Sequence, residues 1–352
     1  MNELRTILSD VVTRLFTDRV TKDVIESAET GAWPDALWQA VEENGLTWPL
    51  VPESKGGAGG TWGDAFVVAR AAGRHAVPLP IVETIVASWL LSASGLDVPS
   101  GPLTLAPVHR EERLRLTRAG SGWRLGGVAA RVPWGRVAGH VVIVTEAEGR
   151  AMVGLASRSA AQVKTDQNLA REPRDTLAFD AAPVVAAAPA GRGVPAHAVW
   201  LYGALVRSAQ IAGGLDYLLR QASQYATERR QFGKPIGSFQ VIQQILAVLA
   251  GHTAAAGTAA AHAFRAADRG DAAFEIAVAK VRVGEAAGVG ASIAHQVHGA
   301  IGFTYEHALQ FVTRRLWSWR AEFGGEGEWS AELGRSVAER GADALWPHLT
   351  SR

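Results

Sequence analysis

The sequence contains no cysteine among its 352 residues. This absence excludes a disulfide framework, thiolate catalysis and cysteine-ligated metal sites, and it is typical of a reducing compartment. The sequence also lacks an excess of either charge, because 35 Lys and Arg residues face 34 Asp and Glu residues. A chain without a net basic field is not expected to have nucleic acid as its main partner.

Long apolar runs are also scarce. The N-terminal residues MNELRTILSDVVTRL have charges scattered through them and no apolar centre of signal-peptide length. The run from Ile81 to Leu91 is shorter than a membrane span and is interrupted by Glu83. We therefore expect a cytoplasmic protein with no membrane partner.

Hydrophobic residues make up 48% and charged residues 20%, the balance of a globular protein with a sizeable core.

The common catalytic motifs are absent as well. The sequence has no GxSxG, HExxH, GxGxxG, P-loop or Asp/Glu calcium loop. His295 and His298 have helical spacing, but a metal site needs a third ligand that the sequence does not show, so we interpret them as helix-end packing residues and expect no metal. Residues 51–60 are rich in glycine but lack the Gly-Lys-Ser/Thr ending of a phosphate-binding loop, and we interpret them as a connection.

The first part of the chain has the pattern of helices. Leu4, Ile7, Leu8 and Val11 follow the spacing of one buried helix face. Further helices are predicted at residues 33–43, 61–74 and 79–93. These segments define a helical domain over residues 1–100.

The middle of the chain changes to short β-rich pieces at residues 122–125, 140–144, 151–156 and 176–179. Turn residues separate them at the spacing of a small barrel or sandwich, which predicts a β-domain over residues 101–190. Helical patterns return after an Ala/Pro/Gly-rich stretch, and a second apolar stripe is formed by Ile242, Ile245, Leu246 and Leu249. Residues 191–352 are therefore predicted to be a helical bundle.

Two segments are more specific than the rest. Residues 225–240, YATERRQFGKPIGSFQ, predict a helix end, a Gly/Pro turn and a new helix opened by Ser238. Arg229 and Arg230 lie where an anionic ligand would meet guanidinium groups and helix-terminal amides. A solvated charged turn explains these residues equally well.

The second segment is QVHGAIGFTYE at residues 296–306. Glycines close to Gln296 allow the backbone to approach a ligand, and the amide side chain is available to its polar groups. A plain helix end followed by a turn explains this segment equally well.

Both segments resemble the signature segments of acyl-CoA dehydrogenases, R-x-x-F-G-x-x-x-x-x-x-Q and Q-x-x-G-G-x-G-[YF], in the same order. Residues 51–60 resemble the family's V-P-E-x-x-G-G-x-G, and residues 122–134 resemble an element of its β-domain, so the likeness covers nearly the whole chain. The resemblance implies a mainly α fold: an N-terminal helical domain, a central β-barrel and a C-terminal four-helix bundle.

The resemblance also implies FAD as cofactor. Arg229, Phe232 and Gln240 correspond to residues that contact its pyrophosphate and adenosine, and Gln296 and Gly299 line the same half-site. In the family, this FAD belongs to the neighbouring subunit. The family's second glycine is Ala300 here. The implied substrate is an acyl-CoA, and the implied electron acceptor is an electron-transferring flavoprotein.

The region that resembles the family's own flavin bed departs from the pattern. Residues 103–112 lack the Gly-Ser pair whose amides hold the flavin, and the W-I-T-N position reads Arg131-Val132-Pro133-Trp134. Proline at this place removes a backbone donor. We therefore predict that the chain has lost its own flavin bed.

The catalytic base departs as well. The family reaction removes the α-proton of an acyl-CoA with a Glu carboxylate while a hydride passes to flavin N5, so the base position is tightly constrained. The two family positions for this Glu fall on Phe323 and Gly203. Glu322 or Glu326 would serve only after a shift of one to three residues, and Glu322 is the candidate base.

Three hypotheses follow. The leading one is that the chain resembles the β-type subunit of heteromeric α2β2 acyl-CoA dehydrogenases acting on steroid side-chain thioesters, which supports the flavin of a homologous α-type subunit. The second is a self-sufficient homo-oligomeric dehydrogenase that uses Glu322 or Glu326. The third is a flavin-free structural homologue.

Overall fold

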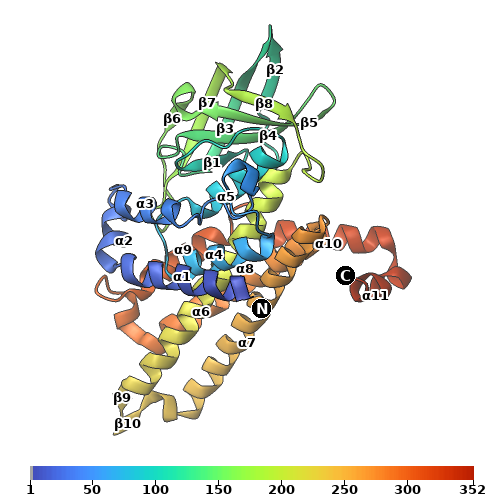
Figure 1. Cartoon of the computed structure of the whole chain (residues 1–352). Helices are drawn as coiled ribbons and strands as arrows, with labels where there is room; N and C mark the ends of the chain where they lie inside the picture. The colour runs from blue at the N-terminus through green and yellow to red at the C-terminus, as the bar shows by residue number, and fades with distance from the viewer. Residues whose placement is uncertain (1–2) are drawn as a thin grey trace.

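The computed structural model describes residues 3–352, and it has helices below and beside a β-domain (Figure 1). The N-terminal helices are α1 (Glu3–Arg19), α2 (Lys22–Glu29), α3 (Asp35–Glu43), α4 (Trp62–Arg74) and α5 (Ile81–Ala93), with a 3-10 turn η1 (Glu53–Lys55). The three helices predicted at 33–43, 61–74 and 79–93 are confirmed as α3, α4 and α5. The short helix α2 was not predicted, because Ile25 is its only buried residue.

The buried face predicted for α1 is wrong. Ile7 and Val11 are exposed, whereas Val12 and Phe16 are fully buried and Leu8 packs beside them; the side chain of Leu4 lies outside the described residues. The helix is therefore present, but its core-facing side is rotated toward the apolar set that continues to Phe16. Packing against α4, rather than the first matching stripe, selects the buried face.

The β-domain consists of two four-stranded sheets, ordered β1-β4-β5-β8 and β2-β3-β7-β6. The strands are β1 (Leu103–Ala106), β2 (Arg115–Ala119), β3 (Gly122–Pro133), β4 (His140–Ala147), β5 (Arg150–Ser157), β6 (Gln162–Lys164), β7 (Arg174–Pro183) and β8 (Ala186–Pro189), with a 3-10 turn η2 (Arg158–Ala160) after β5. Strands β1 and β4 are parallel, and the other pairs are antiparallel. The four predicted β-rich pieces lie within β3, β4, β5 and β7.

Strands β1 and β2 were not predicted. All four residues of β1 are buried, so the strand shows no alternation, and β2 is an exposed edge strand with two arginines. Neither has the period-two pattern by which a half-buried strand is recognised.

The C-terminal region is built on three long helices, α6 (Ala198–Glu228), α7 (Gln240–Arg269) and α8 (Ala273–His298), which pack against one another. The hairpin β9 (Arg230–Gln231) and β10 (Lys234–Pro235) and the 3-10 turn η3 (Ile236–Ser238) join α6 to α7. After α8 come η4 (Gly299–Phe303), α9 (Leu309–Trp319), α10 (Glu326–Arg340) and α11 (Ala342–Thr350). The predicted stripe on α7 is confirmed, because Ile242, Ile245, Leu246 and Leu249 share one cluster with α6 and α8.

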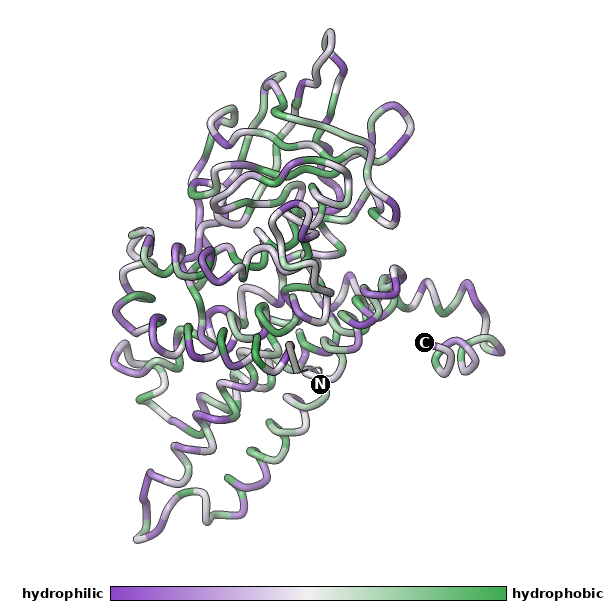
Figure 2. Tube along the Cα trace, viewed as in Figure 1, coloured by the Kyte–Doolittle hydropathy of each residue, from purple (hydrophilic) through white to green (hydrophobic). Residues whose placement is uncertain are grey.

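Helix α7 is unusual in how little of it is buried. Among the described residues it is the helix long and apolar enough to cross a membrane by length and composition, although 22% of its apolar window is buried inside the chain. This contrasts with the expectation that the apolar runs are too short to span. Helix α7 forms one side of the lower arm, whose tip at β9 and β10 is hydrophilic (Figure 2).

The three regions share one hydrophobic core. Its largest cluster runs from α1, α4 and α5 through both sheets to α6 and α8. Helices α4 and α6 approach so closely that a Cβ at Gly73 would overlap the backbone of Gln210, and a Cβ at Gly213 would overlap that of Arg70. This contact fixes α6, which runs from the β-domain to the tip of the arm (Figure 1).

Candidate cofactor half-site and buried junction

The arginine turn lies at the tip of the arm formed by α6 and α7. Arg229 caps the end of α6, and the amide of Ile236 returns to its carbonyl at 2.8 Å. Phe232 and Gly233 both have positive φ angles, which closes the two-residue turn between β9 and β10. The Phe232 side chain is 92% exposed. Within residues 3–352, the guanidinium of Arg229 has no hydrogen bond or ion pair, so its charge is available to a ligand.

The second predicted segment closes helix α8. Gln296 is exposed on its last turn, and Gly299 has φ 65° and ψ −147°, a conformation that only glycine adopts readily. Ala300 is not among the residues with positive φ, so its methyl group is accommodated without backbone strain. Glycine is therefore required at 299 but not at 300 for the shape of this chain.

The structure brings the two segments together. The rings of Tyr225 on α6 and His298 on α8 stack with their centroids 4.6 Å apart, and Ala226 and Val297 share a buried cluster. Arg229, Phe232, Gln240, Gln296 and Gly299 thus lie on neighbouring helix ends of one arm. Their role in binding a cofactor stays a prediction.

The two histidines at this end have hydrogen-bond partners of their own. His295 Nε2 lies 3.0 Å from the Thr313 hydroxyl, and His298 Nδ1 lies 2.7 Å from the carbonyl of Ala294. Burial lowers the pKa of both imidazoles below the usual value. These contacts agree with packing at a helix end.

The two positions at which the family resemblance expects a Glu lie against each other in the interior. Gly203 is on the first turns of α6, and the ring of Phe323 covers it so closely that a Cβ at Gly203 would overlap the ring. Phe323 is buried, has a φ of 54° and belongs to the segment between α9 and α10. The space between these two positions is therefore occupied by a phenylalanine ring and holds no carboxylate.

Glu322 points into a buried ion-pair network. Its carboxylate accepts hydrogen bonds from Arg174 Nε at 2.7 Å and from Arg207 Nε at 2.8 Å. Burial alone would raise the pKa of Glu322, but the two guanidinium groups outweigh it and lower the pKa to about 2. A carboxylate held in this way is a weak base with both oxygens engaged, so the structure argues against Glu322 as the base.

The network extends through all three regions of the chain. Arg207 also pairs with Glu83 on α5, Arg174 pairs with Glu172 at 2.9 Å, and Arg315 on α9 pairs with Glu172 and Glu29 at 3.2 Å each. Counting Arg314, which pairs with Glu29, four guanidinium groups face four carboxylates. The charges balance, which is the condition for burying so many of them.

The other candidate base, Glu326, is engaged as well. It opens α10 and accepts a hydrogen bond from Arg320 Nε at 2.8 Å. Its side chain packs against Gly284 of α8, where a Cβ would meet the carboxylate. Glu326 therefore lies against α8, whereas Phe323, at the position where the family resemblance expects the base, lies against Gly203 of α6.

The backbone at the predicted flavin bed has partners within the chain. At the end of β3, the amide of Trp134 donates to the carbonyl of Pro173 at 2.9 Å, and the amide of Arg136 donates to Asp175 at 2.6 Å. The carbonyl of Pro133 accepts from the hydroxyl of Thr104 on β1. Because these groups are already paired, they do not offer the free amides that a flavin ring needs.

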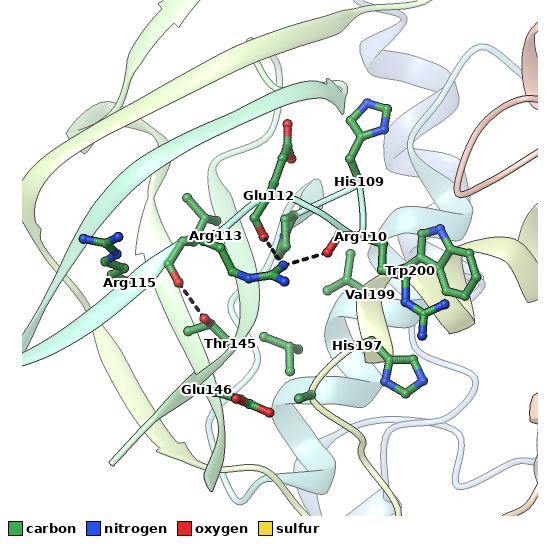
Figure 3. A pocket seen from close by; sticks show the side chains of 14 residues that line it. His109, Arg110, Glu112, Arg113, Arg115, Thr145, Glu146, His197, Val199 and Trp200 are labelled. Carbon is green, nitrogen blue, oxygen red and sulfur yellow. Dashed lines mark hydrogen bonds between the residues drawn. The ribbon is translucent and has the colours of Figure 1, made fainter. Parts of the chain in front are cut away.

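A cavity of about 520 Å³ lies between the loop after β1, strand β4 and the start of α6 (Figure 3). Its centre holds the guanidinium of Arg113, which donates to the carbonyls of Arg110 and Glu112 at 2.7 and 3.2 Å. The Trp200 indole has Arg110 5.1 Å from its ring centre and is stacked on Trp329 at 3.8 Å. The carbonyls of Arg110 and Glu112 are therefore bound within the loop itself.

The half-site and the junction are far apart. Arg207 and Arg229 lie on the same helix, separated by about 30 Å at 1.5 Å per residue. The predicted cofactor-binding residues therefore form one group, and the candidate base Glu322 belongs to another. No motif in the sequence marked the ion-pair partners, because they come from distant segments.

Comparison with known proteins gives the chain a family. Residues 2–97 match the acyl-CoA dehydrogenase N-terminal domain, and residues 196–328 match the acyl-CoA dehydrogenase C-terminal domain. The acyl-CoA dehydrogenase IpdE2 of Mycobacterium tuberculosis is 26% identical over 89% of this chain and 91% of its own length. The acyl-CoA dehydrogenase FadE34 of the same organism is 31% identical over 86% of this chain, which corresponds to 42% of FadE34.

Solved structures share the fold. A steroid acyl-CoA dehydrogenase, Tcur3481–Tcur3483, superposes with a TM-score of 0.87 at 24% identity, over 96% of this chain and 98% of its own. The ChsE4–ChsE5 complex of Mycobacterium tuberculosis superposes with a TM-score of 0.83 at 24% identity, over 97% and 99%. N-terminal helices, a central β-sheet domain and a C-terminal helical domain are thus confirmed, and this chain belongs to the acyl-CoA dehydrogenase family.

Proposed function

We propose that this chain is the supporting subunit of a heteromeric acyl-CoA dehydrogenase. The observation that carries the proposal is the contrast between the closed junction, where Phe323 covers Gly203, and the open arginine turn, where exposed Arg229 has no hydrogen-bond or ion-pair partner among the described residues. The chain then contributes Arg229, Phe232, Gln240, Gln296 and Gly299 to an FAD whose flavin bed and base belong to a homologous partner subunit. Two similar solved proteins, one of them a steroid acyl-CoA dehydrogenase, are pairs of chains.

Each half-site residue has a physical role in this proposal. The guanidinium of Arg229 binds the pyrophosphate through charge-assisted hydrogen bonds, and the backbone at Gly299 allows close approach. Gln240 and Gln296 offer amide groups to the sugar and base. FAD, when bound, accepts the hydride released from the β-carbon of the acyl-CoA.

The exposed apolar residues of the arm support a partner subunit. Leaving Phe232 in water forgoes the stabilisation of about 1.5–3 kcal/mol that burial of such a side chain brings. Val241 and Val248, at 63% and 49% exposure, continue the apolar surface along α7. Because α7 packs lengthwise on α6 and α8, we interpret this surface as a subunit contact and not as a membrane contact.

The substrate class follows from the family, an acyl-CoA thioester, and we propose a steroid side-chain thioester on the likeness to Tcur3481–Tcur3483. We also propose an electron-transferring flavoprotein as the acceptor and the cytoplasm as the location. The base is a carboxylate of the partner subunit, since Glu322 is held by two arginines.

The test is the FAD-to-protomer ratio of the purified chain, alone and after coexpression with a neighbouring dehydrogenase-like chain. We expect no flavin alone and about one FAD per pair of chains. One FAD per protomer in the chain alone would contradict the loss of the flavin bed. A pair that copurifies without flavin would favour the flavin-free structural homologue.

The self-sufficient alternative is tested in the coexpressed complex with Glu322→Gln and Glu326→Gln. We expect both variants to retain turnover per bound FAD. Abolished turnover with FAD still bound would identify the substituted residue as the base and would contradict the proposal that the partner subunit supplies it. Phe323→Glu in the chain alone should not restore activity, because the flavin bed is missing as well.

A further inference from the structure

A second cavity lies among the helices of the N-terminal and C-terminal regions. It has a volume of about 360 Å³ and is lined by α1, the start of α2, the end of α4, the last third of α6 and the start of α9. This volume is within the range of small-molecule sites, about 300–1,000 Å³. None of the predicted half-site or base residues lines it.

The charges that line this cavity are all positive. Arg74 and Arg220 line it together with Lys22, and no Asp or Glu is among its described lining residues. Lys22 is compensated by Glu26, whose carboxylate lies 3.6 Å from its ammonium group. The guanidinium groups of Arg74 and Arg220 have no hydrogen bond or ion pair within the described part of the chain.

His75 lines the same cavity and lies close enough to both arginines for their charges to affect its pKa. Burial, together with the charges of Arg74 and Arg220, lowers the pKa of His75 to about 4. The imidazole is therefore neutral at pH 7, and its Nε2 is buried without a partner among the described residues. Arg74 and Arg220 thus line the cavity beside an unsatisfied polar atom, and Arg74 also acts on the carboxylate of Asp216, which lines the neighbouring cavity.

The rest of the lining is divided between hydroxyl and apolar groups. Thr13 and Tyr217 offer hydroxyl groups, whereas Ile25, Phe311 and Val312 form an apolar wall. A site with a cationic end and an apolar wall suits a ligand that carries one anionic group on a hydrocarbon body.

In a neighbouring cavity, by contrast, the lining arginines Arg5 and Arg70 are paired with carboxylates. That cavity, of about 380 Å³, shares Thr13 and Arg74 and is lined also by Arg5, Arg70 and Asp216. There, Arg70 pairs with Asp216 at 2.7 Å and Arg5 pairs with Asp64 at 2.9 Å. Of the two cavities, the first is the one lined by Arg74 and Arg220 with no Asp or Glu among its described lining residues.

We propose that the cavity between α1, α4, α6 and α9 binds an amphiphilic carboxylate. The carboxylate lies between Arg74 and Arg220, and the hydrocarbon body lies against Ile25, Phe311 and Val312. The site is separate from the cofactor half-site, so the proposal does not depend on the role of this chain as a supporting subunit. It gives the chain a binding function for an organic acid.

The experiment is calorimetric titration of the full chain with decanoate, with decanol as an uncharged match and with inorganic phosphate. We expect saturable 1:1 binding of decanoate, at least about tenfold weaker binding of decanol, and no competition by phosphate. Equal affinity for decanol, or displacement of decanoate by millimolar phosphate, would overturn an amphiphilic anion site. Absence of saturable binding would overturn it too.

Matched variants locate the site. Arg74→Gln combined with Arg220→Gln should weaken decanoate binding about tenfold or more, whereas Arg265→Gln, which lines the neighbouring cavity on α7, should leave it within twofold. Gln221→Glu places a carboxylate in the lining without removing an arginine and should weaken binding in the same way. Unchanged decanoate affinity in both the double variant and Gln221→Glu, with thermal unfolding unchanged, would refute the proposal.

Discussion

Two arginine-rich regions of this chain use the same side chain in opposite ways. At the tip of the arm, Arg229 is exposed and has no partner within the described residues. At the junction of the three regions, Arg174, Arg207 and Arg315 are buried, and each is matched by a carboxylate. The exposed turn leaves the charge of Arg229 available to another molecule. In the buried junction, each arginine is paired with a carboxylate of the same chain.

The difference shows where this chain can carry out chemistry. A buried carboxylate becomes a base when its surroundings raise its pKa, and the arginines around Glu322 lower it. A surface arginine contributes little to folding and much to recognition of an anion. Substitutions in the buried network should therefore lower the stability of the fold. Substitutions in the exposed turn should weaken cofactor binding.

The largest effect is expected from Glu322→Gln. The substitution leaves Arg174 and Arg207 buried with one carboxylate fewer, which should lower the free energy of unfolding by about 3–5 kcal/mol. Urea denaturation measures this change. The control is Glu332→Gln, which breaks the exposed pairs with Arg110 and Arg335 and should cost at most about 1 kcal/mol. Equal losses of unfolding free energy in the two variants would show that the buried network stabilises the chain no more than the exposed pairs do.

The contact between Gly203 and Phe323 should show strong coupling. Gly203→Ala should destabilise the chain by about 1–3 kcal/mol, because the added methyl group overlaps the Phe323 ring. In the Phe323→Ala background, the same methyl group has room, so its cost should nearly vanish. A double-mutant cycle by urea denaturation measures the coupling. Additive losses would mean that the ring does not close this space.

Arg229→Ala should leave the stability of the chain within about 0.5 kcal/mol. In the coexpressed complex it should weaken FAD binding by about tenfold or more, as loss of a charge-assisted hydrogen bond predicts. Flavin fluorescence titration measures the dissociation constant. The matched control is Arg230→Ala, whose guanidinium donates to the carbonyl of Gly233 at 3.3 Å. The same loss in both variants would assign the effect to general charge and not to Arg229.

The smallest effect concerns pH. The pKa of Glu322 is lowered from 4.5 to about 2 on folding, so its contribution to stability is full above pH 5 and is lost as pH falls toward 2. The difference in unfolding free energy between the unmodified chain and Glu322→Gln should shrink by under about 1 kcal/mol between pH 5 and pH 4. Denaturation series at both pH values measure it. A difference that grows on acidification would show that the carboxylate is not held ionised.

Much of the fold follows from local sequence patterns. The helices α3, α4 and α5, the stripe on α7 and four of the strands were predicted from periodicity and turn residues, and the motif segments at 225–240 and 296–306 were placed at helix ends. These features depend on residues within one or two turns of each other. Strand β1, which is wholly buried, and the side of α1 that faces the core were missed, because packing against distant elements determines them.

The sequence alone determined the order of helical and β regions and the helix ends at residues 225–240 and 296–306, since near neighbours in the chain encode turns, caps and stripes. Only the tertiary structure decided which groups hold the carboxylate of Glu322, which ring covers Gly203, and that Arg74 and Arg220 line one cavity. The partners of Glu322 lie 148 and 115 residues away in the chain. The pKa of a carboxylate depends on the charges and the burial around it, and those are set by segments that meet only when the chain has folded.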